Sequence, residues 1–459
     1  MRATWPDTER IVTMTTGLIR FTQRARAEPR CRFNALMGLM YDPEGLHASF
    51  ESQAGKKAPG VDGIRKADYA QGLDERITDL SSRLRRLGYR PQPARRVYIP
   101  KSGSGWRPLG VPCFEDRLVQ DRLSLILQAI WEPEFRDCSY GFRPGRSAHD
   151  ALRRVAEVIT NERIQWVVEA DIKGFFNHVS HDHLVRFLEH RIADPCLLRI
   201  IHRFLKAGVM EDGAVQASEE GTPQGGLASP VLANIYLHYV LDMWFEKRFA
   251  RRCCGKAFLI RYCDDFIACF QSGEDARRFL AELRGRLADF ALEVEPSKTG
   301  LIRFGSAAPW NCKRDGLRRP QTFYFLGFTH FVHRSRRGYF VVGRRTERKR
   351  FQRKLQELNE RLRALRVRGG TAMLCYFRQH MQGHIRYYGV SGNYRQLAAY
   401  AYFASRLLYK WLNRRSQRRS TDWARFRTTL HSCWLPPLRI YHNLYPERLW
   451  KTQAGSRMV

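Results

Sequence analysis

The sequence lacks several features of secreted, membrane and zinc-binding proteins. No stretch approaches the roughly 18 consecutive apolar residues that a membrane span needs, and the longest, residues 227–245, is interrupted by His238 and Asp242. The N-terminal residues contain no basic segment followed by an apolar core, so we do not expect secretion. The eleven cysteines are scattered and form no C-x-x-C motif, which argues against a disulfide framework and a zinc finger. We therefore expect a cytoplasmic protein with no membrane partner.

Acidic residues are scarce relative to basic residues. The 459 residues include 79 Lys and Arg against 45 Asp and Glu, a formal net charge of +34. Such an excess opposes compaction unless a polyanion neutralises it, so nucleic acid is the expected partner. Hydrophobic residues make up 44% of the chain, which is enough for packed cores. The composition thus predicts a folded protein that associates with nucleic acid.

Three acidic residues lie at the ends of apolar strands. Residues 165–172 read as a buried strand, in which alternation places Val167, Glu169 and Asp171 on one face. Residues 257–270 read as two strands joined by a tight turn that contains Asp264 and Asp265. Adjacent acids in an apolar hairpin repel each other and resist burial, so they need a cation. Converging carboxylates suit Mg²⁺, although a lone Asp-Asp pair is also ordinary turn chemistry.

The motifs around these acids resemble those of one family. Residues 262–265 (Y-C-D-D) are similar to the Y-x-D-D box of reverse transcriptases, and residues 170–176 (A-D-I-K-G-F-F) to their first palm motif. Residues 222–237 (T-P-Q-G-G-L-A-S-P-V-L-A-N-I-Y-L) resemble the fourth block of group II intron-encoded proteins. Four further segments resemble motifs of the same family, namely residues 58–63, 96–112, 139–147 and 325–328. In order, from about residue 35 to 445, the chain resembles a group II intron-encoded reverse transcriptase/maturase.

This resemblance implies an α+β, right-hand polymerase fold, with fingers and a palm built on an antiparallel sheet and a following α-helical thumb/maturase domain. Near residue 343 the sequence changes to basic helical segments with an apolar stripe at Leu397, Ala401, Ala404, Leu408 and Trp411. The expected domains are a helical extension (1–50), fingers and palm (51–343), a helical thumb/maturase domain (344–430) and a short basic tail (431–459) with DNA as a candidate ligand.

The resemblance also implies roles for single residues. Asp171, Asp264 and Asp265 would be catalytic and would hold two Mg²⁺ ions, with the Ile172 carbonyl as an additional ligand. The expected nucleotide-binding residues are Lys101, Arg107, Phe176, Gln224 and Gly225. The two cations would bind the triphosphate, Phe176 would exclude a 2′-hydroxyl, and Gln224 and Gly225 would approach the templating base pair. For the cations the alternative is solvated surface, and for Phe176 it is core packing beside Phe175.

Two features distinguish this chain within that resemblance. Cys263 stands where intron-encoded enzymes usually have Ala, and because cysteine is small and buries easily, we expect activity to survive. Arg414, Arg415, Arg418 and Arg419 are the expected RNA-binding residues, since clustered arginines with interleaved aromatics suit structured RNA. Solvated surface is the alternative for them as well.

The function implied is an RNA-directed DNA polymerase that copies intron RNA into cDNA by two-metal phosphoryl transfer and assists splicing and retrohoming. Its partners would be structured intron RNA, a DNA primer or target, and dNTPs. Its location would be the cytoplasm of a bacterial-type cell, in association with RNA or the nucleoid. Cys433 is the only cysteine after Cys375, and we expect a lineage without an H-N-H endonuclease domain. Two alternatives stay open: a free-standing, host-adopted reverse transcriptase in DNA repair or defence, and an RNA-binding splicing cofactor. A group II ribozyme in the flanking DNA would favour the intron function.

Overall fold

A computed structural model describes residues 16–100, 105–211, 213–216, 220–221, 225–335, 337–414, 421–432 and 435–446. Five of the predicted site residues lie outside these ranges: Lys101, Gln224, Arg415, Arg418 and Arg419. The chain divides into two compact units. Unit 1 comprises residues 1–148, 170–268 and 274–300, and unit 2 comprises residues 149–169, 269–273 and 301–459.

The first part of unit 1 is helical, as the sequence predicts for the N-terminal extension. Helices α2 (Thr16–Ala27), α3 (Met37–Tyr41) and α4 (Pro43–Ser52) pack against α7 (Phe114–Trp131), and α5 (Lys66–Tyr69) and α6 (Leu73–Arg85) follow α4 in the chain. Helix α7 is buried along almost its whole length, including four of its five charged residues. Arg122, for example, donates its Nε and Nη2 hydrogens to the carbonyl of Leu39. Buried cations of α7 are thus satisfied by backbone oxygens.

A four-stranded sheet of order β2-β1-β4-β5 also belongs to unit 1. It consists of β1 (Ala94–Pro100), β2 (Trp106–Val111), β4 (Val209–Glu211) and β5 (Ala214–Gln216). The pairs β1–β2 and β4–β5 are antiparallel, whereas β1 and β4 are parallel. The predicted antiparallel pairing is therefore confirmed for the two hairpins and wrong for the β1–β4 pair. Helices α9 (His181–Glu189) and α10 (Pro195–Lys206) precede β4 in the chain. A long connection of this kind can bring β4 back parallel to β1, which a tight hairpin turn cannot do.

The sheet with the predicted acids has the order β6-β7-β3-β8. Its strands are β6 (Ala257–Tyr262), β7 (Asp265–Phe270), β3 (Trp166–Asp171) and β8 (Gly300–Arg303). The β6–β7 turn contains only Cys263 and Asp264, because Asp265, which the sequence places in the turn, already begins β7. Helix α11 (Ser229–Leu237) is buried. It continues into π-helical turns at His238–Asp242 and Phe245–Phe249 and then into a 3₁₀ turn at Ala250–Arg252. Helix α12 (Gly273–Ala288) follows β7.

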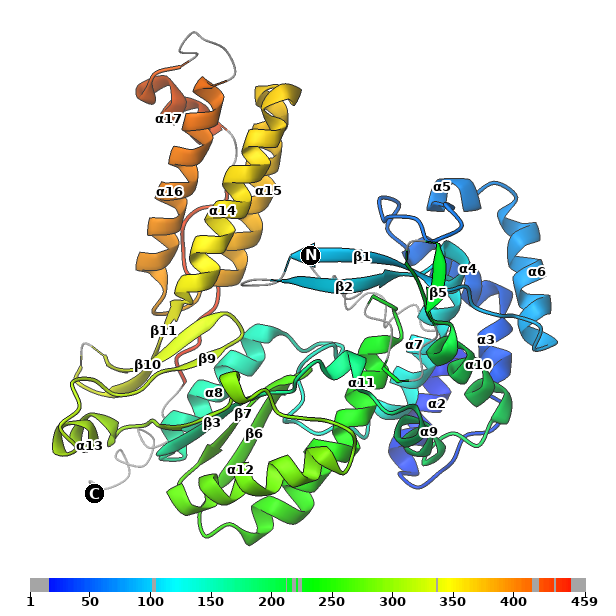
Figure 1. Ribbon diagram of the computed structural model, residues 1–459, viewed down its shortest axis with the longest axis horizontal. Helices are drawn as coiled ribbons and strands as arrows, with labels where there is room; N and C mark the ends of the chain where they lie inside the picture. The colour runs from blue at the N-terminus through cyan, green and yellow to red at the C-terminus, as the bar shows by residue number, and fades with distance from the viewer. Residues whose placement is uncertain are drawn as a thin grey trace, which may run out of the picture. The chain divides into compact units, whose positions relative to one another are not determined.

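Unit 2 combines a small sheet with a group of helices. After α8 (Ala148–Asn161) and α13 (Ala308–Arg314), an antiparallel sheet of order β11-β10-β9 comprises β9 (Phe323–Phe325), β10 (Phe328–Arg334) and β11 (Phe340–Thr346). Helices α14 (Arg348–Leu365), α15 (Gly370–Tyr388) and α16 (Tyr394–Asn413) then lie side by side, and α17 (Trp423–Ser432) follows (Figure 1).

The helical character predicted after residue 343 is confirmed, since α14 begins at Arg348. In the predicted apolar stripe of α16, Leu397, Ala404, Leu408 and Trp411 are buried and Ala401 is half-buried. The two units are defined by contacts and are discontinuous along the chain. The bounds of the four functional domains therefore stay a prediction.

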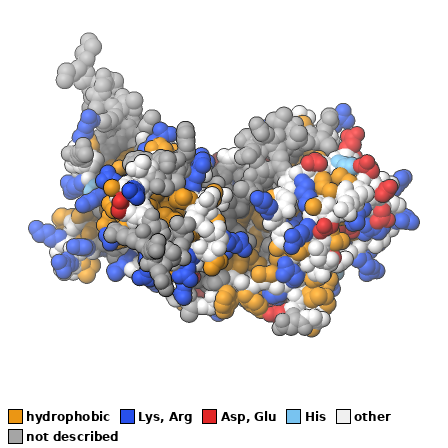
Figure 2. All heavy atoms as spheres, turned by 90° about the horizontal axis from the view of Figure 1, so that it is seen from above, with side chains coloured by type: hydrophobic (Ala, Val, Ile, Leu, Met, Phe, Trp, Pro, Cys, Tyr) orange, Lys and Arg blue, Asp and Glu red, His pale blue; other side chains and the backbone are white. Residues whose placement is uncertain are grey.

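Basic side chains are more frequent than acidic ones on the face shown in Figure 2, in keeping with the net charge of +34. None of the helices in the described ranges has the length and apolar composition needed to cross a membrane.

Candidate active site

Asp171 is the last residue of β3, and the structure pairs its side chain with a cation that the sequence analysis did not identify. Lys298, at the end of the 3₁₀ turn Pro296–Lys298, donates from Nζ to Asp171 Oδ2 at 2.5 Å. Burial lowers the pKa of Lys298, but its hydrogen bond with Asp171 and the charges of Asp171, Glu295 and Asp265 outweigh that effect, so the pKa is raised. Lys298 therefore stays positively charged beside Asp171 and within the field of Asp265.

Asp264 and Asp265 lie at the turn between β6 and β7. Burial raises the pKa of Asp264 and the charge of Asp171 raises it further, whereas Arg107 acts in the opposite direction. Asp171 and Arg107 are thus within electrostatic range of Asp264. The three predicted acids and Arg107, one of the two predicted triphosphate-binding cations, all belong to unit 1.

The carbonyl of Ile172 is oriented by a short antiparallel bridge to Val294. The bonds of this bridge run from Lys173 N to Glu293 O and from Glu295 N to Asp171 O, each at 2.8 Å. In such a pair the central residues use neither their N–H nor their C=O groups toward each other. The Ile172 carbonyl therefore points away from Val294, which leaves it available as an oxygen ligand.

These atoms fit a divalent cation by their chemistry. Three carboxylates and one carbonyl are the hard oxygen ligands that Mg²⁺ prefers. The raised pKa of Asp264 shows that its charged form is disfavoured, and a bound cation would reverse that preference. Within the described ranges, no three His, Cys, Asp or Glu side chains stand close enough to form a ready metal group. Instead, Asp171 is paired with Lys298.

A fully buried arginine holds the turn that contains Asp264. The Arg261 guanidinium donates to both carboxylate oxygens of Asp242, from Nε at 2.8 Å and from Nη2 at 2.5 Å. Nη1 also donates to the carbonyl of Cys263 at 3.0 Å. Cys263 is buried and has a left-handed φ of +59°, a conformation that costs energy in a residue with a Cβ. Arg261 therefore links a buried ion pair to the strained residue next to Asp264.

The same network includes residues of two motifs identified in the sequence. Arg261 also donates to Asn234 Oδ1 at 3.0 Å and to Ser139 Oγ at 2.9 Å. The side chain of Asn234 donates to the carbonyl of Gly141 at 2.7 Å. A Cβ on Gly141 would lie 2.4 Å from the backbone nitrogen of Cys263, so only glycine permits this approach. Residues 139–147 and 222–237 thus both support the β6–β7 turn.

Arg261, Asp242 and Lys298 are not among the site residues that the sequence predicts. Arg261 precedes the Y-C-D-D box directly, and a charged residue inside an apolar strand was the available signal. Asp242 interrupts the long apolar stretch in the same way. Lys298 has no comparable signal, because it is one of 79 basic residues.

The described nucleotide-binding candidates have distinct environments. Phe176 is half-buried and packs edge-on against Phe175, which is fully buried, with ring centroids 5.3 Å apart. Phe175 is therefore the core residue of this pair. Gly225 has φ +119°, and a Cβ there would lie 2.3 Å from the carbonyl oxygen of Gly110 in β2. The close approach expected of Gly225 thus occurs toward β2, while its approach to a base pair stays a prediction.

Arg414 is the one predicted RNA-binding arginine within the described ranges. It is exposed, directly follows α16, and its guanidinium carbon lies 5.9 Å from the ring centroid of Trp411. Because Trp411 is buried, only the Arg414 side chain of this pair is exposed, and its contact with RNA stays a prediction.

Comparison with known proteins gives a family and several relatives. The reverse transcriptase (RNA-dependent DNA polymerase) family matches residues 99–330. The chain is 38% identical over 231 residues to Protein YkfC of Escherichia coli, covering 49% of this chain and 60% of that protein. It is 40% identical over 208 residues to the group II intron-encoded protein LtrA of Lactococcus lactis, covering 45% of this chain and 34% of LtrA.

A third relative is the mitochondrial nuclear intron maturase 1 of Arabidopsis thaliana, with 32% identity over 95 residues, covering 21% of this chain and 13% of that protein. The matches span less than two thirds of each of these relatives. They confirm the resemblance to group II intron-encoded proteins and maturases that the motifs indicate.

The Arg261 network predicts a separation between stability and catalysis. Lysine at position 261 could still pair with Asp242 but could not also reach the Cys263 carbonyl and Asn234, because it has one point charge instead of a planar guanidinium. We expect Arg261→Lys to lower the maximal rate of nucleotide addition at least about tenfold, since small misplacements of reacting groups are costly. The KM for nucleotide should change little. Steady-state kinetics and a thermal melt measure these effects.

Arg191→Lys is the matched control. Arg191 is also buried, pairs with Glu134 at 2.9 Å and donates to backbone carbonyls, but it has no contact with the hairpin among the described residues. We expect both variants to lose stability and only Arg261→Lys to lose rate. Equal rates in the two variants would show that Arg261 is merely structural.

Proposed function

This chain belongs to the reverse transcriptase family, and we propose that it is an RNA-directed DNA polymerase of the group II intron type. It copies intron RNA into cDNA and acts as a maturase that assists splicing of the same RNA. The observation that supports this most is the convergence of Asp171 with Asp264, at the Y-C-D-D turn, within a segment that the family matches. The substrates are a DNA primer or target, an RNA template and dNTPs, and the site of action is the cytoplasm.

In the proposed mechanism, the three acids hold two Mg²⁺ ions together with the Ile172 carbonyl. When bound, such ions lower the pKa of a primer 3′-hydroxyl and neutralise charge on the transferred phosphoryl group. The protein's own contribution is to fix the acids: Arg261 orients the turn, and the β3–Val294 bridge orients Ile172. Lys298 supplies a positive charge at Asp171, which an ion would replace on binding.

Two further residues act on the incoming nucleotide. Arg107 is exposed and within electrostatic range of Asp264, so its guanidinium can pair with the triphosphate, with Lys101 as the second cation. The half-buried ring of Phe176 lies five residues after Asp171 and leaves no room for a 2′-hydroxyl beneath the sugar. Gln224 and Gly225 contact the templating base pair. The thumb arginines 414, 415, 418 and 419 bind intron RNA.

The acids at the turn should be essential for catalysis but not for folding. We expect Asp264→Ala to lower cDNA synthesis on the order of 1,000-fold or more, because removing a metal ligand withdraws several kcal/mol of charge stabilisation. Primer extension on a primed RNA template measures this loss. Asp289→Ala, which changes an exposed acid in the same unit, should keep full activity. Near wild-type synthesis by Asp264→Ala would refute the catalytic assignment.

Phe176 should determine sugar selection. We expect Phe176→Ala to raise incorporation of ribonucleotides relative to deoxynucleotides at least about tenfold, because the steric barrier to the 2′-hydroxyl is removed. Competition between dNTPs and rNTPs in primer extension measures the ratio. In Phe175→Leu, which alters the buried neighbour, the melting temperature should fall without a change in discrimination. If Phe176→Ala leaves the ratio unchanged, its ring has only a packing role.

The thumb arginines should separate RNA binding from polymerisation. Replacing Arg414, Arg415, Arg418 and Arg419 with Ala should weaken intron RNA binding and splicing severely, and each lost phosphate contact should reduce the salt slope by about 0.7–0.9. Extension of a short pre-annealed primer at low salt should suffer less. Both activities are measured on one preparation. Equal loss would place the four arginines in the primer–template clamp, and no loss in either assay would leave them as solvated surface.

A further inference from the structure

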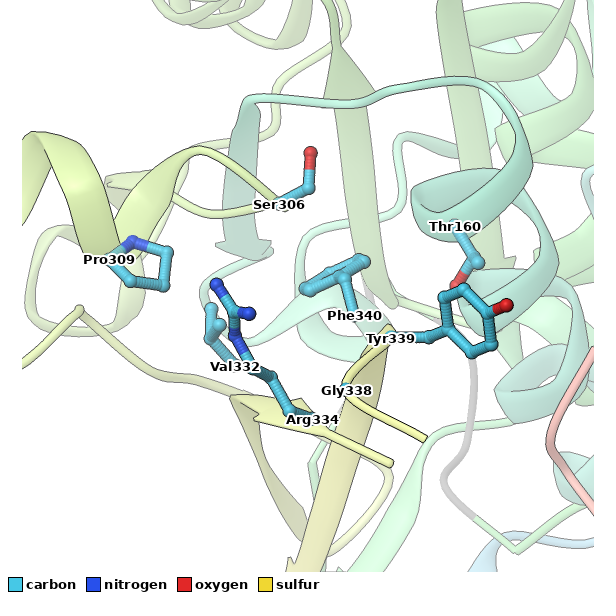
Figure 3. A pocket seen from close by; sticks show the side chains of 8 residues that line it. All are labelled: Thr160, Ser306, Pro309, Val332, Arg334, Gly338, Tyr339 and Phe340. Atoms are coloured by element: carbon cyan, nitrogen blue, oxygen red, sulfur yellow. The ribbon is translucent and has the colours of Figure 1, made fainter. Parts of the chain in front are cut away.

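A pocket in unit 2 is lined by residues outside the segments that the proposed chemistry uses. It has a volume of about 310 Å³ and is bordered by the end of α8, the start of α13 and the β10–β11 hairpin. Figure 3 shows the Phe340 ring in the middle, with Pro309, Val332 and Arg334 on one side of it, Tyr339 and Thr160 on the other, and Ser306 above it. This volume falls at the lower end of the range of about 300–1,000 Å³ for small-ligand pockets.

The aromatic side of the pocket is held by the hairpin turn. Tyr339 donates from its backbone nitrogen to Ser335 Oγ at 3.3 Å, and its carbonyl accepts from Ser335 N at 2.8 Å. Gly338 supplies the positive φ of +76° that the turn requires. The tyrosine is nevertheless 39% exposed. A fixed backbone thus presents an accessible ring, which lowers the entropy cost of stacking a ligand on it.

The charge of the segment that contributes most of the pocket is almost entirely positive, whereas the end of α8 adds Glu157, which is paired with Arg154 at 3.5 Å, and Glu162 follows it. Residues 301–345 contain ten Lys and Arg and one acid, Asp315, and that acid is paired with Arg303 at 2.7 Å and Arg314 at 3.0 Å. Arg334, at the pocket, is exposed and makes no ion pair with any carboxylate in the described ranges, and the same holds for Arg337 and Lys313. These exposed cations are therefore complementary to an anionic ligand and not to an apolar peptide without acidic residues.

A second exposed aromatic residue lies on α13. Trp310 is 65% exposed, and the guanidinium of Arg314 lies 5.2 Å from its ring centroid. Exposed rings among exposed cations are the combination that binds single strands, because rings stack on unpaired bases while cations pair with phosphates. Unpaired bases are typical of loops and bulges in structured RNA.

We propose that this pocket binds one unpaired nucleotide of a single-stranded RNA segment. The base stacks on Tyr339 and Phe340, the Ser306 hydroxyl hydrogen-bonds to it, and Arg334 pairs with the adjoining phosphate. The neighbouring surface of α13, with Trp310, contacts the next part of the strand. The inference goes with the proposed function, since such an enzyme binds RNA, but it assigns a site that neither polymerisation nor the thumb arginines require.

Photo-crosslinking tests the location directly. The probe is a 12-nucleotide single-stranded RNA that contains 4-thiouridine, bound to the full-length protein in EDTA so that no synthesis occurs. We expect crosslinks in the tryptic peptide of residues 338–344, which contains both rings. An equimolar DNA strand of the same sequence and millimolar UMP should each fail to remove them. Absence of that crosslink, or its complete removal by UMP, would overturn the proposal, the latter in favour of a free-nucleotide site.

A double variant with a matched control tests the energetics. Arg334→Ala/Tyr339→Ala removes one exposed cation and one exposed ring at the pocket, and Arg85→Ala/Tyr394→Ala removes the same two groups elsewhere on the surface. We expect the pocket variant to weaken binding of the 12-nucleotide RNA at least about fivefold, the lower bound for one lost stacking contact. The control should lose less than about twofold. Equal losses would mean that charge alone is measured and would overturn the proposal.

Primer extension distinguishes this site from the polymerase site. The pocket variant should extend a short pre-annealed primer as fast as the wild type, and loss of that activity would overturn the claim of a separate site. Asp264→Ala should retain the crosslink in residues 338–344. If the wild-type protein fails to synthesise DNA while this crosslink persists, the polymerase proposal fails and the RNA site stands.

Discussion

Adjacent carboxylates at a two-residue turn repel each other, and partial burial removes the water that would otherwise screen them. Such a turn can form only if other interactions hold its backbone. In this protein that interaction comes from Arg261, whose guanidinium binds the Cys263 carbonyl. Because Asp242 already balances the charge of Arg261, the arginine fixes the backbone without neutralising Asp264 or Asp265. The two acids therefore keep their capacity to bind an external cation.

A buried ion pair of this kind is a weak source of stability, because the desolvation of both ions offsets most of their attraction. Its value here is orientation. The guanidinium engages Asp242, Asn234, Ser139 and the Cys263 carbonyl in one plane, so moving any of these groups disturbs the others. Segments that are distant in the sequence thereby act on one turn, which explains why residues 139–147 and 222–237 accompany the Y-C-D-D box.

The sequence allowed the acids to be placed together, because alternation determines the face of Asp171 and the hairpin determines the position of Asp264. It did not determine the partners of buried polar groups. Asp242 is 19 residues from Arg261 and Ser139 is 122 residues away, and such pairs leave no local periodicity. The β1–β4 parallel pairing was missed for the same reason, as was the contact of Gly225 with Gly110. The pocket at Tyr339 is formed by three separate segments, none of which forms a motif alone.

The net charge of +34 accounts for attraction to nucleic acid but not for where a strand binds. Phosphate contacts are alike along any strand, and their strength falls steeply with salt. Stacking depends little on salt and requires an unpaired base at a defined ring. Charge alone would let a strand bind anywhere on the basic surface. A surface that combines Arg334 with Tyr339 therefore determines where on the protein an unpaired base binds. In a chain with so many cations, the exposed aromatic residues that stand among unpaired arginines are the better guide to specific RNA contacts.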